Sequence, residues 1–441
     1  MMDVALAKTD TGRAASEAFA VACSRLPGAG KVAAARQKAF EAYESLGLPH
    51  RRVEDWKYTD LRVLMREVLP LAAAPDQAAL AKAGEILKAQ SLGDAYRFVL
   101  VDGVFVPQLS DVGGLEDGLR ARSFHEVLGT GTDQSADLFT TSATTDVMVS
   151  LNAAMTTDGV IIEVGDRISL TKPIHVVHVT TVSSASAFTR SRLTIGKAAR
   201  VTLIESFVAA DDAKSYQAHD ALIVAVGDGA DVAHIRLMAD ADDATNISSA
   251  IVTVGGEAKL NLFSLTSGGR LSRYQVFATL EGEGSDVFFN GVSLLKDTQH
   301  ADMTLVVDHA VPHCTSREVF RAVVDDRAHS VFQGKIIVRP DAQKTDGKMM
   351  TRALLLSDGA EADSKPELEI FADDVTCGHG ATIGALDDSL LFYLRARGLS
   401  EKEAQALLIQ AFVGEAIESI ADDGLRDVAI GAAERWLAAR E

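Results

Sequence analysis

A regularly recurring glycine is the feature that most restricts how this chain can fold. Between about residues 160 and 295, alternating runs typical of β-strands, such as ADVAHIRL and AKLNLFSL, are separated by glycines, and the third residue after each glycine is mostly small. A repeat of this length is characteristic of stacked coils, each of which buries its apolar face against the next. The repeat therefore predicts a β-helix. The glycines are separated by 31, 31, 28 and 27 residues and are Gly165, Gly196, Gly227, Gly255 and Gly282.

An antiparallel β-sandwich is the alternative that this spacing leaves open. In a sandwich the same glycines would occupy ordinary hairpin turns. Two further runs, DDRAHSVFQGKIIV and DGAEADSKPELEI, continue the pattern to about Gly384. The spacing by itself favours neither fold over the other.

Both ends of the chain have the composition of helices. Near the N-terminus, KVAAARQKAFEAYESLGLP is rich in Ala, Lys and Glu and ends at Gly47 and Pro49. The pattern changes at YRFVLVDGVFVPQL, where Asp102-Gly103 predicts a two-residue hairpin turn. We expect a helical region over residues 1–95, a β-rich core over 96–384 and a helical domain over 385–441.

The C-terminal tail predicts three amphipathic helices. Asp387 opens the first helix at the positive end of its dipole, and Ser400 with Glu403 forms a capping box for the second. Such a tail either seals the last coil or docks a partner, and the sequence favours neither. The predicted apolar stripe of the second helix is Ala404, Leu407, Leu408, Ala411 and Phe412.

The acidic composition excludes several classes of function. The 441 residues carry a formal net charge of −19, whereas a nucleic-acid surface needs excess Lys and Arg. The chain has no stretch of apolar residues long enough for a membrane helix, and its N-terminal segment lacks the apolar core of a signal peptide. We therefore expect a cytoplasmic protein without nucleic-acid or membrane partners. In so acidic a chain, RRVEDWKYTDL is interpreted as a docking motif that packs Trp56 on the β-rich core.

Three cysteines limit the redox and metal chemistry of the chain. Cys23, Cys314 and Cys377 are too few for a disulfide framework or a four-cysteine metal cluster, and their separations match no zinc-finger spacing. The best candidate for metal chemistry is Cys377-Gly378-His379, because a thiolate and an imidazole two residues apart on a strand point to the same face. Two ligands do not complete a site, so the residues alone favour a buried cysteine beside a hydrogen-bonded histidine.

A second group of possible ligands lies between residues 300 and 329. His300, His309, His313 and His329 are separated by nine, four and sixteen residues, and Cys314 adjoins His313. These spacings suit no single helix face. We interpret the group as surface or interface residues of a β-helix rather than as a metal site.

The sequence predicts no nucleotide site and no catalytic centre. LPGAGKV, at residues 26–32, resembles a phosphate-binding loop, but Arg25 stands where the first glycine is required and no Ser or Thr follows Lys31. VGDGADV fails the dinucleotide-binding pattern at Val232. The chain also lacks a G-x-S-x-G elbow and a recognisable triad, so we expect a protein that is not an enzyme.

Several longer motifs together resemble the SufB/SufD family of iron–sulfur cluster assembly scaffolds. LLLSD, KPELEIFADDV, CGHGATIG and LFYLRARG follow one another in this order between residues 350 and 400. QGKIIVRPDAQKTDG at residues 333–347 and DHAVPHCTSREVF at residues 308–320 extend the resemblance upstream. HRRVEDWKYTDLR, at residues 50–62, is similar to the SufD branch in particular. The family pattern has Ser where Gly378 stands here, which changes the freedom of that turn.

The resemblance implies both a fold and partners. The fold is mainly β with helical ends, a right-handed parallel β-helix core flanked by an N-terminal helical region and a C-terminal helical bundle. The implied function is that of a scaffold subunit that pairs with a SufB-like paralogue and binds a SufC-like ATPase through its C-terminal helices. A homodimer is left open. No iron–sulfur cluster is expected to stay bound to the isolated chain, and a transient cluster forms at the interface with SufB.

The resemblance also implies site residues. His379 matches the family position that helps to form the nascent cluster together with a cysteine of SufB, and Cys377 is a weaker candidate. The absence of a nucleotide site means that the energy of ATP hydrolysis would arrive through the partner bound to the tail. The residues expected to bind SufC are Leu391, Phe392, Tyr393, Arg395, Leu407 and Phe412.

Two alternatives to a SufD-like subunit remain at this point. A SufB-like cluster-carrying paralogue would need more thiols than this chain has, and the WKYTDL element and the modest length also favour SufD. A β-helix enzyme acting on polysaccharides would need paired carboxylates and aromatic platforms along one sheet. Aromatic residues make up only 6% of the sequence, which disfavours such an enzyme.

Overall fold

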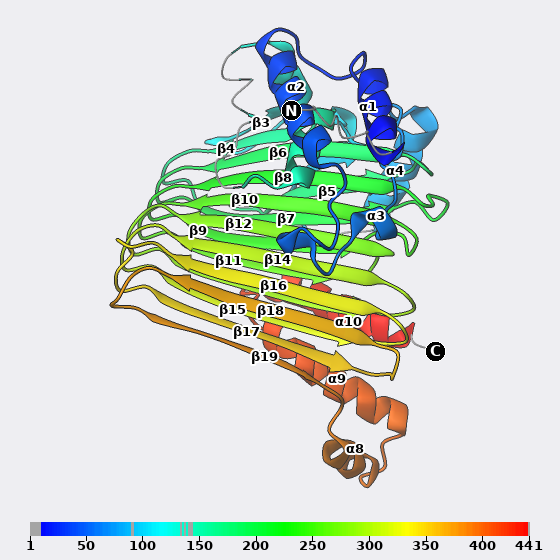
Figure 1. Cartoon of the computed structure of the whole chain (residues 1–441), viewed down its shortest axis with the longest axis vertical. Helices are drawn as coiled ribbons and strands as arrows, with labels where there is room; N and C mark the ends of the chain where they lie inside the picture. Colours follow the sequence, from blue (N-terminus) through cyan, green and yellow to red (C-terminus); the bar gives the residue numbers. More distant parts are fainter. Residues whose placement is uncertain (1–9, 90–91, 133–134, 136–137, 140–143, 440–441) are drawn as a thin grey trace, which may run out of the picture.

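The computed structural model describes residues 10–89, 92–132, 135, 138–139 and 144–439. Two stacked sheets of parallel strands run the length of the molecule, and successive strands alternate between them (Figure 1). From β6 to β17 each strand pairs in parallel with the strands two before and two after it, in an uninterrupted register. This pairing confirms the parallel β-helix and excludes the antiparallel sandwich.

The strands of the ten-stranded sheet are β1 (Tyr96–Val101), β2 (Val104–Phe105), β5 (Ile174–Thr180), β7 (Arg200–Ala209), β9 (Asp231–Ala239), β11 (Lys259–Thr266), β13 (Asp286–Leu295), β15 (Thr315–Val324), β17 (Asp346–Leu355) and β19 (Thr376–Gly384). Those of the nine-stranded sheet are β3 (Leu119–Ser123), β4 (Val160–Val164), β6 (Ser186–Ile195), β8 (Gln217–Val226), β10 (Thr245–Val254), β12 (Leu271–Leu280), β14 (His300–His309), β16 (His329–Val338) and β18 (Glu361–Ile370). Two pairs at the N-terminal end are antiparallel, β1 with β2 and β3 with β4.

The recurring glycines stack on one another at one corner of the coils. Each follows the end of a strand of the nine-stranded sheet, where neighbouring backbones approach closely. A Cβ atom on Gly196 would lie 2.5 Å from the backbone nitrogen of Asp166, and one on Gly227 would lie 2.8 Å from the carbonyl carbon of Gly196. A Cβ on Gly282 would overlap the backbone nitrogen of Gly256. From Gly196 onward the repeat therefore marks a corner where neighbouring backbones leave no room for a side chain.

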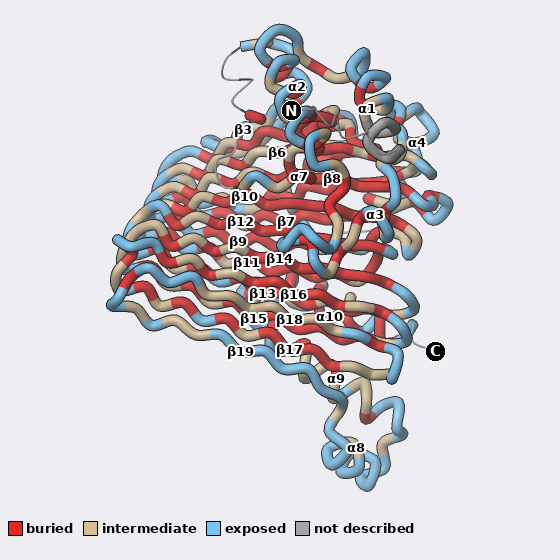
Figure 2. The backbone as a smooth tube through the Cα atoms, viewed as in Figure 1, coloured by how far each residue is buried: buried red, intermediate tan, exposed pale blue. Residues whose placement is uncertain are grey.

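Alternate residues of each strand point into the β-helix or out of it. In β7, Val201 and Leu203 belong to the apolar core inside the coils. Ile204, the residue after Leu203, points the other way and belongs to the apolar cluster beneath the C-terminal helices. The small residues after the glycines, such as Ala199 and Ala230, are buried in the inner core. Buried residues accordingly run along most of the strands and give way to exposed ones in β19 (Figure 2).

The N-terminal elements confirm two local predictions. The segment rich in Ala, Lys and Glu forms α2 and stops at Gly47, and Asp102-Gly103 closes the β1–β2 hairpin with positive φ angles of 49° and 82°. The division into units at residues 95 and 384 stays a prediction. The helices of this part are α1 (Asp10–Ala22), α2 (Lys31–Leu46), α3 (Leu61–Leu64), α4 (Gln77–Ala89), α5 (Phe124–Gly129) and α7 (Val147–Met155), with 3-10 turns η1 (Glu54–Trp56) and η2 (Pro107–Leu109).

The docking motif packs on the outer face of the nine-stranded sheet, as expected. The Trp56 ring is buried, its centroid lies 3.8 Å from the guanidinium carbon of Arg273, and its Nε1 donates a hydrogen bond of 2.9 Å to Asp146. Arg273 in turn pairs with the buried Asp302, to which Thr59 also donates a hydrogen bond. These contacts hold the segment between α2 and α3 across several coils (Figure 1).

The tail forms α8 (Asp388–Arg395), α9 (Glu401–Ile417) and α10 (Asp423–Ala438). The predicted caps are present, because Asp387 accepts hydrogen bonds from the backbone of Ser389 and Leu390, and Ser400 with Glu403 forms the capping box. α9 and α10 pack on the outer face of the ten-stranded sheet, where their apolar residues cover Ile204, among others. These two helices therefore do not seal the last coil, and α8 extends past it (Figure 1).

The predicted apolar stripe of the second tail helix was wrong in part. Ala404 is buried, but Leu407 and Ala411 are exposed, and Leu408 and Phe412 are only half-buried. The buried face of α9 lies on a different side of the helix from the predicted stripe, because the tail lies along the sheet rather than over the end of the coils. Its buried members are Ala404, Ile409, Val413, Ala416 and Ile417. No helix within the described ranges is both long and apolar enough to cross a membrane.

Candidate functional site

The C-terminal coil of the β-helix ends in two open strand edges. β18 is the last strand of the nine-stranded sheet and β19 is the last strand of the ten-stranded sheet. Apolar side chains on and beside these strands, Ile370, Phe371 and Ile383, are exposed. An open edge presents unpaired backbone donors and acceptors that can extend a sheet across an interface. The terminal coil is therefore a candidate partner surface.

Cys377 and His379 lie on β19, in this terminal coil. The parallel register places Cys377 beside Gly347 and His379 beside Met349. Met349 is buried in the inner core, so the two residues of β19 occupy inward-facing positions. Cys377 is half-buried against that core, whereas His379 is exposed because no further coil follows β19.

The electrostatic environment of Cys377 favours the protonated thiol. Burial raises the pKa of Cys377, and the nearby carboxyl groups of Asp346 and Glu318 raise it further. A hydrogen bond from the backbone of Gly347 opposes this effect. Because the thiolate is the form that binds metal, Cys377 must release its proton to a base or to water when a metal ion binds.

Gly378 and Gly380 differ in the space around them. A Cβ on Gly378 would meet no heavy atom within 4 Å, whereas a Cβ on Gly380 would lie 2.6 Å from the terminal methyl group of Met350. Gly378 therefore leaves open space on the outer face of β19, opposite the face that carries the two candidate ligands.

Glu318 is an inward-facing residue two coils before this site, and no sequence motif had singled it out. The register runs from Phe289 through Glu318 and Met349 to His379, one residue per coil. Glu318 is fully buried, and neither of its carboxylate oxygens has a hydrogen-bond partner in the described part of the chain. Burial raises the pKa of Glu318 to about 8. The strict alternation of TSREVFRAVV, with Glu318 in phase with buried Ser316 and Phe320, was the available signal.

The histidines between residues 300 and 329 do not converge with Cys314 on one point. The rings of His300 and His329 pack edge to face at 4.8 Å, and His300 contacts Thr59. His309 shares a hydrogen bond of 3.0 Å with Ser316 inside the coils. His313 is exposed in a turn with φ of 62°, while the neighbouring Cys314 is buried and accepts a hydrogen bond from Ser285.

The residues expected to bind an ATPase are divided between α8 and α9. Phe392 is 75% exposed, Tyr393 is 51% exposed, and Leu391 is half-buried. Arg395 forms an ion pair of 3.3 Å with Glu401. Leu407 is exposed on α9, whereas the half-buried Phe412 lies 5.7 Å from the buried Arg321 and so faces the β-helix.

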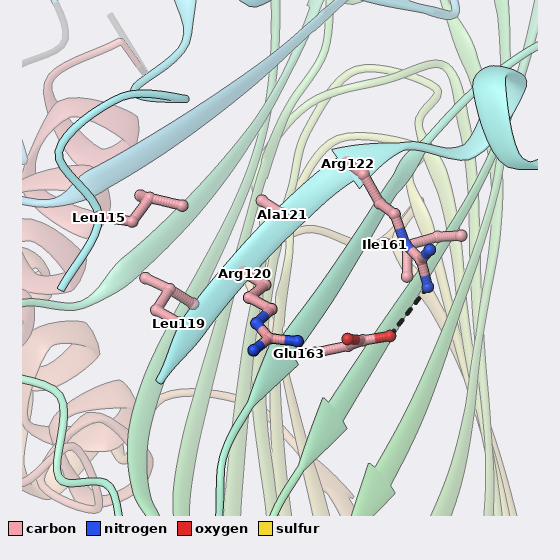
Figure 3. A pocket seen from close by; sticks show the side chains of 7 residues that line it. All are labelled: Leu115, Leu119, Arg120, Ala121, Arg122, Ile161 and Glu163. Carbon is pink, nitrogen blue, oxygen red and sulfur yellow. Dashed lines mark hydrogen bonds and ion pairs between the residues drawn. The ribbon is translucent and has the colours of Figure 1, made fainter. Parts of the chain in front are cut away.

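A hollow of about 600 Å³ lies at the opposite, N-terminal end of the β-helix (Figure 3). Arg122 and Glu163 form an ion pair of 3.0 Å across it, between β3 and β4. The hollow is open to solvent and is remote from the terminal coil. Its lining residues are Leu115, Leu119, Arg120, Ala121, Arg122, Ile161 and Glu163.

Comparison with known proteins identifies the family. Residues 178–412 match the model of the SUF system FeS cluster assembly SufBD core domain, and residues 28–176 match that of the SufBD protein N-terminal region. The chain belongs to the SufBD family. It is therefore a member of the SUF iron–sulfur cluster assembly system, as the motifs had indicated.

Full-length relatives support this membership. An iron–sulfur cluster assembly SufBD family protein of Synechocystis sp. is 32% identical over 397 residues, which cover 87% of this chain and 86% of the relative. The iron–sulfur cluster assembly protein SufD of Escherichia coli is 31% identical over 389 residues, covering 86% and 87%. A chloroplastic protein of Arabidopsis thaliana is 26% identical over 413 residues, covering 89% and 84%. SufBD family proteins are assembly and scaffold components.

Proposed function

We propose that this SufBD family member is a SufD-like scaffold subunit, rather than a SufB-like cluster carrier. The observation that carries the proposal is the terminal coil, where an exposed His379 and a half-buried Cys377 lie on an open strand edge. One exposed imidazole and one half-buried thiol give an incomplete ligand set. A partner must supply the remaining ligands of any cluster built there.

The partner at this edge is a SufB-like paralogue. A second β-helix with an open terminal coil can continue both sheets, because its strands offer the complementary backbone groups. The exposed Ile370, Phe371 and Ile383 would lose their contact with water in such an interface. A nascent iron–sulfur cluster, as cargo, would then lie between His379 and a thiolate of the partner.

The SufC-like ATPase binds the surface that α8 and the start of α9 present. None of the α8 residues is buried, although Leu390, Phe392 and Tyr393 are large and apolar. Leu407 adds an exposed apolar side chain on α9, and Arg395 provides charge at the rim. Phe412 contributes differently, because its position near Arg321 holds α9 on the β-helix.

Replacement of His379 tests the proposed interface. The chain is co-expressed with its SufB-like and SufC-like partners, and His379→Ala should leave the complex intact while the bound iron and sulfide fall about tenfold or more, since a ligand is lost. Cys377→Ala should reduce the yield less, and His313→Ala, at an exposed turn outside the site, is the matched control. A normal cluster yield with His379→Ala would refute the proposal, and loss of the complex would assign His379 a structural role.

Anaerobic reconstitution of the chain alone separates the SufD-like from the SufB-like alternative. Three cysteines, one of them exposed, one buried and one half-buried, cannot surround a cluster, so little stable cluster absorbance is expected. A stoichiometric and stable cluster on the isolated chain would favour a SufB-like carrier.

A further inference from the structure

A group of ionisable side chains lies inside the first coils of the β-helix, away from the terminal coil. His178 of β5, Glu205 of β7 and Asp220 of β8 offer one nitrogen and two oxygen atoms within 4.8 Å of one another. The Nε2 atom of His178 lies 3.8 Å from Oε1 of Glu205 and 3.9 Å from Oδ1 of Asp220. All three residues are buried, with residue exposures of 8% or less.

This group is costly to bury unless it has a ligand. The buried Nε2 of His178 has no hydrogen-bond partner in the described part of the chain. Burying an ionised carboxylate or an unsatisfied polar atom is unfavourable, and apolar residues usually pack such a position with greater stability. The neighbouring core positions Val176 and Leu203 are apolar, so the fold itself does not require polar residues inside these coils.

The surrounding residues fix the orientation of the three side chains. The ring of His178 stacks on Phe207 at 4.3 Å, with an angle of 7° between the planes. Thr189 donates a hydrogen bond of 2.6 Å to Asp220, and His234 Nε2 lies 3.2 Å from the second oxygen of Glu205. Metal ligands are commonly held by outer hydrogen bonds of this kind.

Arg236 is a buried cation near this group, and it does not occupy the space between the three side chains. Its guanidinium group lies between the rings of Phe207 and Tyr274, at 4.5 and 4.2 Å, and Nη2 donates a hydrogen bond to Asn246. Among the described residues Arg236 forms no ion pair with either carboxylate. Its charge weakly opposes the rise in the pKa of Asp220 and adds to the larger effect of His234 in lowering the pKa of Glu205.

We propose that His178, Glu205 and Asp220 bind one divalent first-row transition-metal ion, such as Zn²⁺ or Co²⁺. Bonds of about 2.0–2.2 Å would let a single ion contact all three atoms after side-chain shifts of a few tenths of an ångström. A cavity of about 20 Å³ adjoins the group and is lined by His178, Asp220 and Gly103, among others. It has room for roughly one water molecule as a fourth ligand.

The protonation states of the group suit an incoming cation. Burial, with a weaker effect of Arg236, lowers the pKa of His178 to about 4, so the imidazole is neutral and its Nε2 is available. Burial and the adjacent Glu205 charge raise the pKa of Asp220 well above its ordinary range.

Calorimetric titration of the metal-stripped full-length chain with Zn²⁺ tests the site. We expect one strong binding event. His178→Ala and Asp220→Asn should each weaken binding about tenfold or more. Glu318→Gln is the matched control, because Glu318 is also a buried inward-facing carboxylate but has no such histidine. His313→Ala controls for adventitious binding at an exposed imidazole.

A second measurement covers variants that fail to fold. Co²⁺ bound to the wild-type chain should give visible absorption of a low-coordinate imidazole and carboxylate site, and excess Zn²⁺ should abolish it. The proposal is wrong if wild-type protein binds Zn²⁺ no more tightly than folded Asp220→Asn, or if Glu318→Gln or His313→Ala loses the binding equally.

Discussion

Glu318→Gln should stabilise the folded chain, and the gain should depend on pH. A carboxyl group whose pKa is raised on folding binds its proton more tightly in the folded state. Below the unfolded pKa the group does not change the free energy of unfolding. As the pH rises from the unfolded pKa to the folded pKa, the free energy of unfolding falls. For Glu318 this window runs from 4.5 to about 8. Glutamine has the shape of the protonated acid but does not titrate.

The magnitude follows from the width of the window. Each pH unit within it costs about 1.4 kcal/mol, so the glutamate costs roughly 3 kcal/mol at pH 7 and about 5 kcal/mol above pH 8. Urea unfolding of both proteins at pH 5, 7 and 8.5 gives the difference in the free energy of unfolding. This difference should rise from below about 1 kcal/mol at pH 5 to roughly 3 kcal/mol at pH 7 and about 5 kcal/mol at pH 8.5.

The pH dependence of that difference is the decisive quantity. An unpartnered glutamine amide would add a cost that is constant with pH, so it would not imitate the expected trend. Glu434→Gln, at an exposed position on α10, is the matched control for the loss of one negative charge. A difference between wild type and Glu318→Gln that stays constant from pH 5 to 8.5 would refute the reasoning.

Two further predictions concern the tail and the glycine corner. Phe392→Asp combined with Leu407→Asp should abolish binding of the SufC-like ATPase in co-purification without lowering the unfolding temperature. Ile430→Asp, at an exposed apolar residue of α10, should leave binding intact, and unchanged binding in the double variant would remove α8 from the interface. Gly282→Ala should destabilise the chain by roughly 3 kcal/mol or more in thermal unfolding, because the added Cβ would overlap the backbone of Gly256. Gly378→Ala should change the free energy of unfolding by less than about 1 kcal/mol. Similar values for the two variants would contradict the stacked corner.

The glycine repeat and the helix caps could be predicted from sequence because they depend on short spacings. Gly196 and Gly227 are constrained by the coil immediately before each, and Ser400 by a residue three positions on. The buried face of α9 could not be predicted in the same way. Leu407 has the spacing of a core residue but is exposed, because the sheet that α9 covers determines which side is buried.

The buried group of His178, Glu205 and Asp220 could not be predicted from the sequence either. Glu205 and Asp220 are brought together by the stacking of two sheets, and neither has a characteristic neighbour in the chain. Cys377 and His379 were found because only one residue separates them. Whether they share one metal ion depends on a partner surface outside this chain.

The unequal ends of the β-helix limit how many molecules can join. At the C-terminal end, β18 and β19 present full-length edges of nine or ten residues. At the other end, the outermost strands are the two-residue β2 and the short antiparallel β3, and N-terminal helices lie beside them (Figure 1). Two molecules that meet through their C-terminal edges leave no matching edge for a third. Growth by sheet extension therefore stops at a pair, and the fold can keep a reactive open edge without forming fibres.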